Sequence, residues 1–158
     1  MSSNHAIVPA RQPAAFAAAA HLFRDYQAAI GIDLGFQGFE AELAGLPGAY
    51  APPDGELLLA VTVNGAAEGC IALRRLNGGD SEIKRLYVAP AARGEALGRR
   101  LAVAIINSAR QLNYRRVFLD TLPEMEAATA LYRDLGFRAC SPYGKAALDD
   151  ALFFELDL

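Results

Sequence analysis

Apolar residues recur along the chain with two different periods, and each period predicts a different kind of element. After Pro13, large apolar residues return every seven positions, which keeps them on one face of a helix. These positions are Phe16, Phe23 and Ile30. Gly31 is expected to end this helix, because glycine readily adopts the conformation that follows a last helical turn. The mixture of aromatic residues and glycines over Gly35–Tyr50 indicates a short helix within loops.

The middle of the chain changes to a strand pattern. Leu57–Val63 and Glu68–Leu73 flank Asn64-Gly65, a dipeptide typical of hairpin turns because both residues tolerate positive φ. A second turn, Asn77–Asp80, leads to a third strand over Glu82–Val88. We therefore expect three consecutive antiparallel strands.

The second half of the chain alternates helices and strands. A helical period begins near Arg93 and reaches Leu112, and a strand, a helix ended by Gly136 and a last strand follow. These three elements are expected at Arg116–Thr121, Ala128–Leu135 and Leu152–Leu156, with a further short strand at His5–Val8. The order predicts an α/β (α+β) fold: a single domain over residues 1–158, with a central mixed, mostly antiparallel sheet flanked by helices.

Composition fits one folded domain and excludes some functions. The 158 residues are 53% hydrophobic and 21% charged, enough to bury a core without metal or disulfides. A net charge of −3 argues against non-specific nucleic-acid binding, which depends on an excess of Lys and Arg. Cys70 and Cys140 have no metal-ligand spacing, so we expect two buried thiols rather than a disulfide or redox pair. No stretch indicates a membrane span or a signal peptide, and a cytoplasmic protein is expected.

The segment Ser81–Gly98 is the first candidate for chemistry. It is a strand, a proline turn, a glycine-bearing loop and the start of a helix. Unpaired N–H groups and the dipole at a helix N-terminus favour an anion, so the segment predicts a pyrophosphate cradle. An ordinary strand–turn–helix connection with solvated arginines is the alternative. The loop lacks the Gly-Lys-Ser/Thr ending of a Walker A loop.

This segment resembles the acyl-CoA signature of the GNAT superfamily of N-acetyltransferases, Val-x-Pro followed by Arg/Gln-x-x-Gly-x-Gly/Ala. The matching residues are Val88, Pro90, Arg93, Ala96 and Gly98. Ala130–Phe137 (ALYRDLGF) resembles a later helix of the same family. The two matches together cover roughly residues 57 to 140, in the family's order.

The resemblance implies acetyl-CoA as co-substrate, without a metal, and gives roles to individual residues. Backbone groups of Leu86 and Val88 would pair with the pantetheine arm, and Tyr132 would protonate the leaving thiolate. Glu82 would take the proton from the attacking amine. Backbone amides would hold the pyrophosphate along Arg93, Gly94, Glu95, Ala96, Leu97, Gly98 and Arg99.

Three points stay open at this stage. Tyr132 could be a core tyrosine, and Glu82 a surface carboxylate paired with a neighbouring cation. Strict alternation would put Glu82, Lys84, Leu86 and Val88 on one face of the strand, whereas a β-bulge would change that parity. Ala96 stands where the family signature has its first glycine. At negative φ it would be tolerated, and at positive φ it would cost about 1 kcal/mol or more.

The expected function is transfer of an acetyl group from acetyl-CoA to a primary amine. A small-molecule acceptor is preferred to a peptide amine, and the alternative is a non-catalytic acyl-CoA-binding module of the same fold. No nucleic-acid or membrane partner is expected. The last strand, Leu152–Leu156, could offer an edge for a homodimer.

Overall fold

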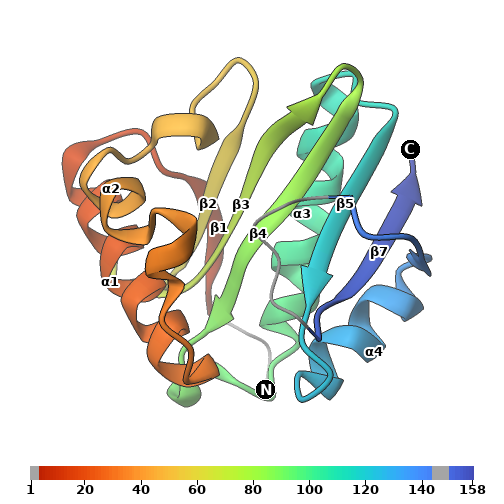
Figure 1. Cartoon of the computed structure of the whole chain (residues 1–158). Coiled ribbons are helices and arrows are strands. Elements are labelled where there is room, and N and C mark those ends of the chain that lie inside the picture. The colour runs from red at the N-terminus through yellow and green to blue at the C-terminus, as the bar shows by residue number, and fades with distance from the viewer. Residues whose placement is uncertain (1–3, 144–149) are drawn as a thin grey trace.

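A computed structural model describes residues 4–143 and 150–158, apart from the side chains of residues 36 and 37. Its described strands form one seven-stranded sheet in the order β1-β2-β3-β4-β5-β7-β6 (Figure 1). The strands are β1 (Ala6–Pro9), β2 (Glu56–Val61), β3 (Ala67–Asn77), β4 (Asp80–Val88), β5 (Arg116–Thr121), β6 (Arg138–Ala139) and β7 (Leu152–Asp157). The α-helices are α1 (Pro13–Ile30), α2 (Phe39–Ala44), α3 (Leu97–Gln111) and α4 (Glu126–Asp134). Among these described strands, only β4 and β5 pair in parallel, which confirms a mixed, mostly antiparallel sheet.

Helices cover both faces of the sheet. Helices α1 and α2 lie on one face, and α3 lies on the other (Figure 1). Along β3, Cys70 and Ala72 pack in the core under α1 and α2, whereas Ile71 and Leu73 pack in the core under α3 and α4. Burial on both faces explains why the central strands are continuous apolar runs rather than alternating ones.

The expected elements are present, with shifted ends and one missed strand. Asn77 and Asp80 pair directly, so Gly78 and Gly79 form a two-residue hairpin turn as expected. Helix α3 begins at Leu97 and not near Arg93, which has an extended backbone after a short 3-10 turn. The two-residue strand β6 carries too little sequence pattern to be predicted.

The prediction that the last strand offers a free edge is wrong. Strand β7 pairs with β5 along its whole length and with β6 on its other side. Its backbone groups are therefore largely satisfied within the sheet. At this end of the described sheet, β6 is the edge strand. Within the described residues, no helix combines the length and apolar character needed to cross a membrane.

A β-bulge in β4 decides which way the side chains of this strand point. The register shifts between the pairs Cys70–Tyr87 and Ala72–Lys84, where β4 has one extra residue, and Arg85 has a φ of 64°. Lys84 lies opposite Ala72, on the face of α1 and α2, and Glu82 two residues earlier lies on the same face.

Beyond the bulge, Leu86 and Val88 pack against the core under α3. The strict alternation that would put them on one face with Glu82 and Lys84 is therefore wrong. The bulge turns the second half of β4 over relative to the first.

Strands β4 and β5 separate after a short paired stretch. Their pairing joins Asp80–Glu82 to Arg116–Phe118, and beyond it the two strands diverge (Figure 1). The later part of β4 therefore has backbone groups that face no neighbouring strand on the β5 side. An extended chain in this gap would find partners there, as a strand added to a sheet edge does.

Candidate active site

A groove of about 360 Å³ lies between β4, the loop after it, α3 and α4. We call it the α3 groove. Its lining includes seven of the nine residues expected to bind the cofactor: Leu86, Val88, Arg93, Gly94, Ala96, Leu97 and Gly98. Glu95 and Arg99, the other two, do not line it. The sequence match thus corresponds to a physical hollow and not merely to a turn.

The backbone before α3 has the shape of an anion cradle. Gly94 and Ala96 both have positive φ, 90° and 57°, and α3 starts directly afterwards. Such a turn at a helix N-terminus directs unpaired N–H groups outward. A methyl group at Gly98 would come within 3.9 Å of Leu131 and 4.0 Å of Val88, so the bare glycine keeps this part of the groove open.

The charged side chains of this loop are already engaged with the protein. Arg93 donates from Nε to the carbonyl of Val88 at 2.9 Å, and its guanidinium lies over the Tyr87 ring. Arg99 pairs with Asp134 of α4. These side chains therefore shape the loop and tie it to α4.

A second, smaller pocket lies where β4 and β5 separate. It holds about 50 Å³, and we call it the central pocket. It shares Leu86 and Ala128 with the α3 groove, so the two spaces are neighbours. Its lining comes from both faces of the sheet: Tyr26, Ile30 and Leu34 from the α1 side, and Ile83, Leu119 and Tyr132 from the α3 side. The pocket therefore passes through the sheet.

Tyr132 brings a phenol to the central pocket. The residue is 5% exposed, and its ring packs edge-on against Phe137 with the ring centres 5.5 Å apart. Burial raises the pKa of Tyr132 well above its ordinary value, so the phenol keeps its proton at neutral pH. Tyr132 is thus a core tyrosine that also lines the central pocket.

Asp120 is a pocket residue that the sequence patterns did not indicate. It follows Leu119 in β5, and it lines the central pocket together with Tyr132. Burial raises the pKa of Asp120, an effect that nearby Lys84 opposes and the like charge of Glu82 reinforces. The feature of the sequence that could have indicated Asp120 is an acidic residue within the apolar strand Arg116–Thr121.

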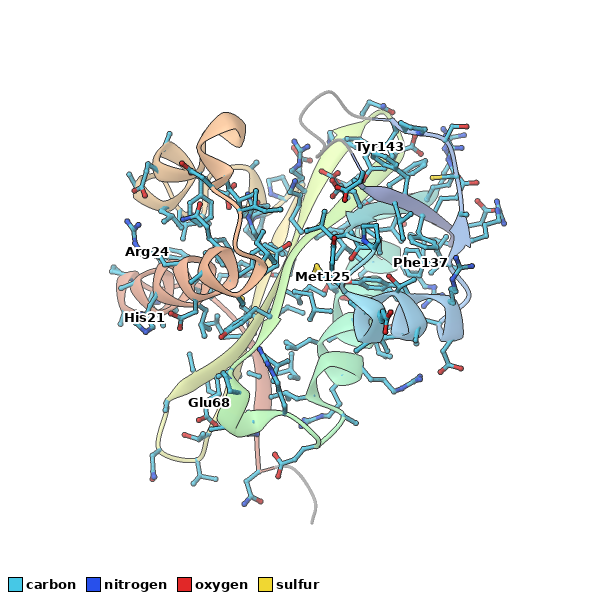
Figure 2. The ribbon with its side chains drawn as sticks, turned by 60° about the horizontal axis from the view of Figure 1, so that its bottom comes forward. His21, Arg24, Glu68, Met125, Phe137 and Tyr143 are labelled. Atoms are coloured by element: carbon cyan, nitrogen blue, oxygen red, sulfur yellow. The ribbon has the colours of Figure 1, made fainter. Side chains whose placement is uncertain are left out.

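Glu82 does not line the central pocket, although the next residue, Ile83, does. Glu82 is 4% exposed, and both carboxylate oxygens are occupied. Oε1 accepts from Arg74 Nε at 2.8 Å, and Oε2 accepts from the Tyr143 hydroxyl at 2.6 Å. The Tyr143 ring packs against Phe118 and Phe153 beside β7 (Figure 2). Met125, which lines the central pocket, lies lower in the same view.

A third space, the α2 pocket, adjoins the central pocket on the opposite side from the α3 groove. It holds about 480 Å³ between the α2 segment and strands β3 and β4. It shares Lys84 and Arg85 with the central pocket. The three spaces form a series from the α3 groove to the α2 pocket, with Asp120 and Tyr132 in the middle. The described residues include no cluster of three or more His, Cys, Asp or Glu suited to a metal ion.

Sequence comparison agrees with this geometry. Residues 18–137 match the acetyltransferase (GNAT) family. An uncharacterized N-acetyltransferase of Schizosaccharomyces pombe is 37% identical over 138 residues, which cover 87% of this chain and 85% of the relative. The chain belongs to the GNAT family and is an N-acetyltransferase of that family.

Solved structures show the same fold. A GNAT-family acetyltransferase of Staphylococcus aureus Mu50 superposes with a TM-score of 0.82, at 22% identity, covering 97% of this chain and 98% of its own. A Salmonella typhimurium protein solved with its cofactor acetyl-CoA gives a TM-score of 0.74, at 19% identity, covering 98% of this chain and 94% of its own.

Proposed function

We propose that the protein transfers an acetyl group from acetyl-CoA to a primary amine of a small molecule, by direct attack of the amine on the thioester. The observation that carries the proposal is the series of three neighbouring spaces. The α3 groove receives the cofactor, the α2 pocket receives the acceptor, and the reacting groups meet in the central pocket.

The α3 groove fits coenzyme A in shape and chemistry. The open edge of β4 at Leu86 and Val88 supplies backbone partners for the amide groups of a pantetheine arm. The amides of the loop from Gly94 to Gly98 and the start of α3 suit the pyrophosphate. Acetyl-CoA supplies the activated acetyl group, and the chain supplies position and proton transfer.

Proton transfer is assigned to Asp120 and Tyr132. An ammonium has no lone pair for attack, so a carboxylate must first accept its proton, directly or through water. Asp120 is suited to this role because burial raises its pKa toward the working pH. Tyr132, whose phenol is protonated at neutral pH, then donates a proton to the thiolate as the C–S bond breaks, and the second proton leaving the nitrogen restores the phenol. The reaction consumes the ammonium and the thioester and yields an amide, a thiol and one proton.

Glu82, which the resemblance suggested as the base, is the second candidate for that role. Its oxygens are held by Arg74 and Tyr143, so a proton would reach it only through a chain of water or by breaking one of these bonds. The geometry therefore favours Asp120.

The test combines cofactor binding with turnover. Calorimetry with acetyl-CoA is expected to give saturable binding that is lost when Gly98 is replaced by leucine. Release of free thiol in the presence of a panel of primary amines then reports transfer. Binding without transfer to any amine would contradict the proposed transfer, and absence of binding would contradict the assignment of the α3 groove.

A further inference from the structure

The cationic residues around the α2 pocket differ in whether they have an ion-pair partner. Three cationic residues of the sheet line it: Arg74, Lys84 and Arg85. Arg85 is bound through Nε and Nη2 to both oxygens of Glu42, at 3.0 and 2.9 Å, and its side chain is 3% exposed. These contacts already commit its charge to Glu42.

Arg74 and Lys84, the other two cationic residues, differ in their partners. Arg74 is bound to Glu82 at 2.7 Å. Among residues 4–143 and 150–158, the side chain of Lys84 has no hydrogen bond and no carboxylate within ion-pairing distance. Lys84 thus lines both the α2 pocket and the central pocket with a positive charge that no described residue neutralises directly.

Lys84 and Asp120 stand at corresponding positions on neighbouring strands. The parallel register pairs Glu82 with Phe118, and Lys84 and Asp120 each follow two residues later on the same face. The charge of Lys84 acts to lower the pKa of Asp120, although the two side chains form no ion pair within 4.0 Å. A positive and a negative group therefore come from neighbouring strands and line the same pocket.

We propose, on the basis of the proposed function, that the acceptor is a zwitterionic primary amine, such as an α-amino acid. Its carboxylate binds the ammonium of Lys84, and its amine lies at Asp120, facing the thioester. The opposite wall of the α2 pocket leaves room for a side chain, because its residues are mostly small: Gly38, Ala41, Gly45, Gly48 and Ala49.

The same charges disfavour polyamines. The single acidic residue that lines the α2 pocket, among those described, is Glu42, which is already bound to Arg85. A second ammonium on the acceptor would lie against Lys84 without a counter-charge. The local field at the pocket thus selects against cations even though the whole chain carries a net charge of −3.

The experiment compares matched acceptors. Alanine, methionine and phenylalanine are assayed beside their carboxamides, and kcat/KM is measured for each at one pH. The wild type is expected to favour the acid over the amide by roughly tenfold or more, as for one charge-assisted hydrogen bond. Lys84→Met, which keeps the stem and removes the charge, is expected to bring the ratio near one, and Lys84→Arg to retain part of it.

Controls distinguish binding of the acceptor carboxylate by Lys84 from an effect of Lys84 on the pKa of Asp120 alone. If Lys84 acted only on the pKa of Asp120, Lys84→Met would change both acceptors by one factor and leave the ratio intact, which would overturn the proposal. Arg24→Ala, at an exposed α1 residue paired with Glu40, should alter neither rate. A wild type that acetylates amides but not acids overturns the acceptor class alone. A wild type that binds acetyl-CoA and acetylates neither these compounds nor any other small primary amine overturns the proposed function too.

Discussion

Asp120 and Tyr132 line one pocket although they come from opposite faces of the sheet. Tyr132 belongs to the core under α3 and α4, whereas Asp120 follows Leu119 of that core and so projects to the other face. They meet because β4 and β5 separate beyond Phe118. The gap lets Tyr132, the proposed acid, from the α3 side and Asp120, the proposed base, from the α1 side line the same small pocket.

Tyr132→Phe isolates the phenolic proton. The ring packing against Phe137 is kept, so the fold should be retained, and kcat should fall by about a hundredfold, at the low end for a lost general acid because a thiolate is a good leaving group. The affinity for acetyl-CoA should be nearly unchanged, since the α3 groove does not include Tyr132. Rapid-mixing turnover and calorimetry measure the two quantities. Unchanged turnover would remove Tyr132 from the acid role.

Asp120→Asn and Glu82→Gln form a matched pair for the base. Each substitution removes one carboxylate with little change in shape. Asp120→Asn is expected to lower kcat/KM by about 10² to 10⁴. Glu82→Gln should have a much smaller effect, because Glu82 does not line the central pocket. The reverse order in a steady-state assay at neutral pH would assign the proton transfer to Glu82.

Asp120→Asn should also change the pH dependence of stability. The pKa of Asp120 is raised in the folded state, so ionisation of Asp120 destabilises the fold. The loss of unfolding free energy begins above the pKa of Asp120 in the unfolded chain and grows until the pH passes its pKa in the folded protein. The variant should therefore have the higher Tm at neutral pH, and the difference should vanish below the ordinary pKa of an aspartate. Thermal unfolding at a series of pH values measures it. A lower Tm for the variant at neutral pH would show that Asp120 makes a stabilising contact as a carboxylate.

The sequence predicted the order of elements and most of the α3 groove because both depend on local patterns. Hydrophobic period and glycine turns are read over a few residues, and the groove lies within one strand–loop–helix segment. The location of Asp120 beside Tyr132 depends on the register of β4 against β5 and on where they separate, which are long-range properties. The bulge at Arg85 has the same origin, because a single extra residue leaves no signal in a strand of mixed side chains.

Ala96→Gly tests the cost of alanine in the cradle. Ala96 has a φ of 57°, a conformation that costs an L-residue about 1–2 kcal/mol, whereas glycine adopts it freely. After the greater chain entropy of glycine in the unfolded state is subtracted, the variant should gain about 0.5 to 1 kcal/mol of unfolding free energy. Its affinity for acetyl-CoA should be equal or higher. Asn113→Gly, at another positive φ away from the groove, is the control that should leave affinity unchanged. A large loss of affinity in Ala96→Gly would mean that the methyl group packs on the cofactor.

Gly98→Ala should separate stability from cofactor binding. Gly98 lies in the first turn of α3, and alanine there should favour the helix by up to about 1 kcal/mol. The new methyl group would lie 3.9 Å from Leu131 and 4.0 Å from Val88, ordinary contact distances, so the free protein accommodates it. The same methyl group occupies space in the α3 groove, and the Kd for acetyl-CoA should rise. Chemical denaturation and calorimetry on the same preparation measure the two effects. A variant that is more stable and binds acetyl-CoA as tightly as the wild type would mean that the cofactor does not approach Gly98.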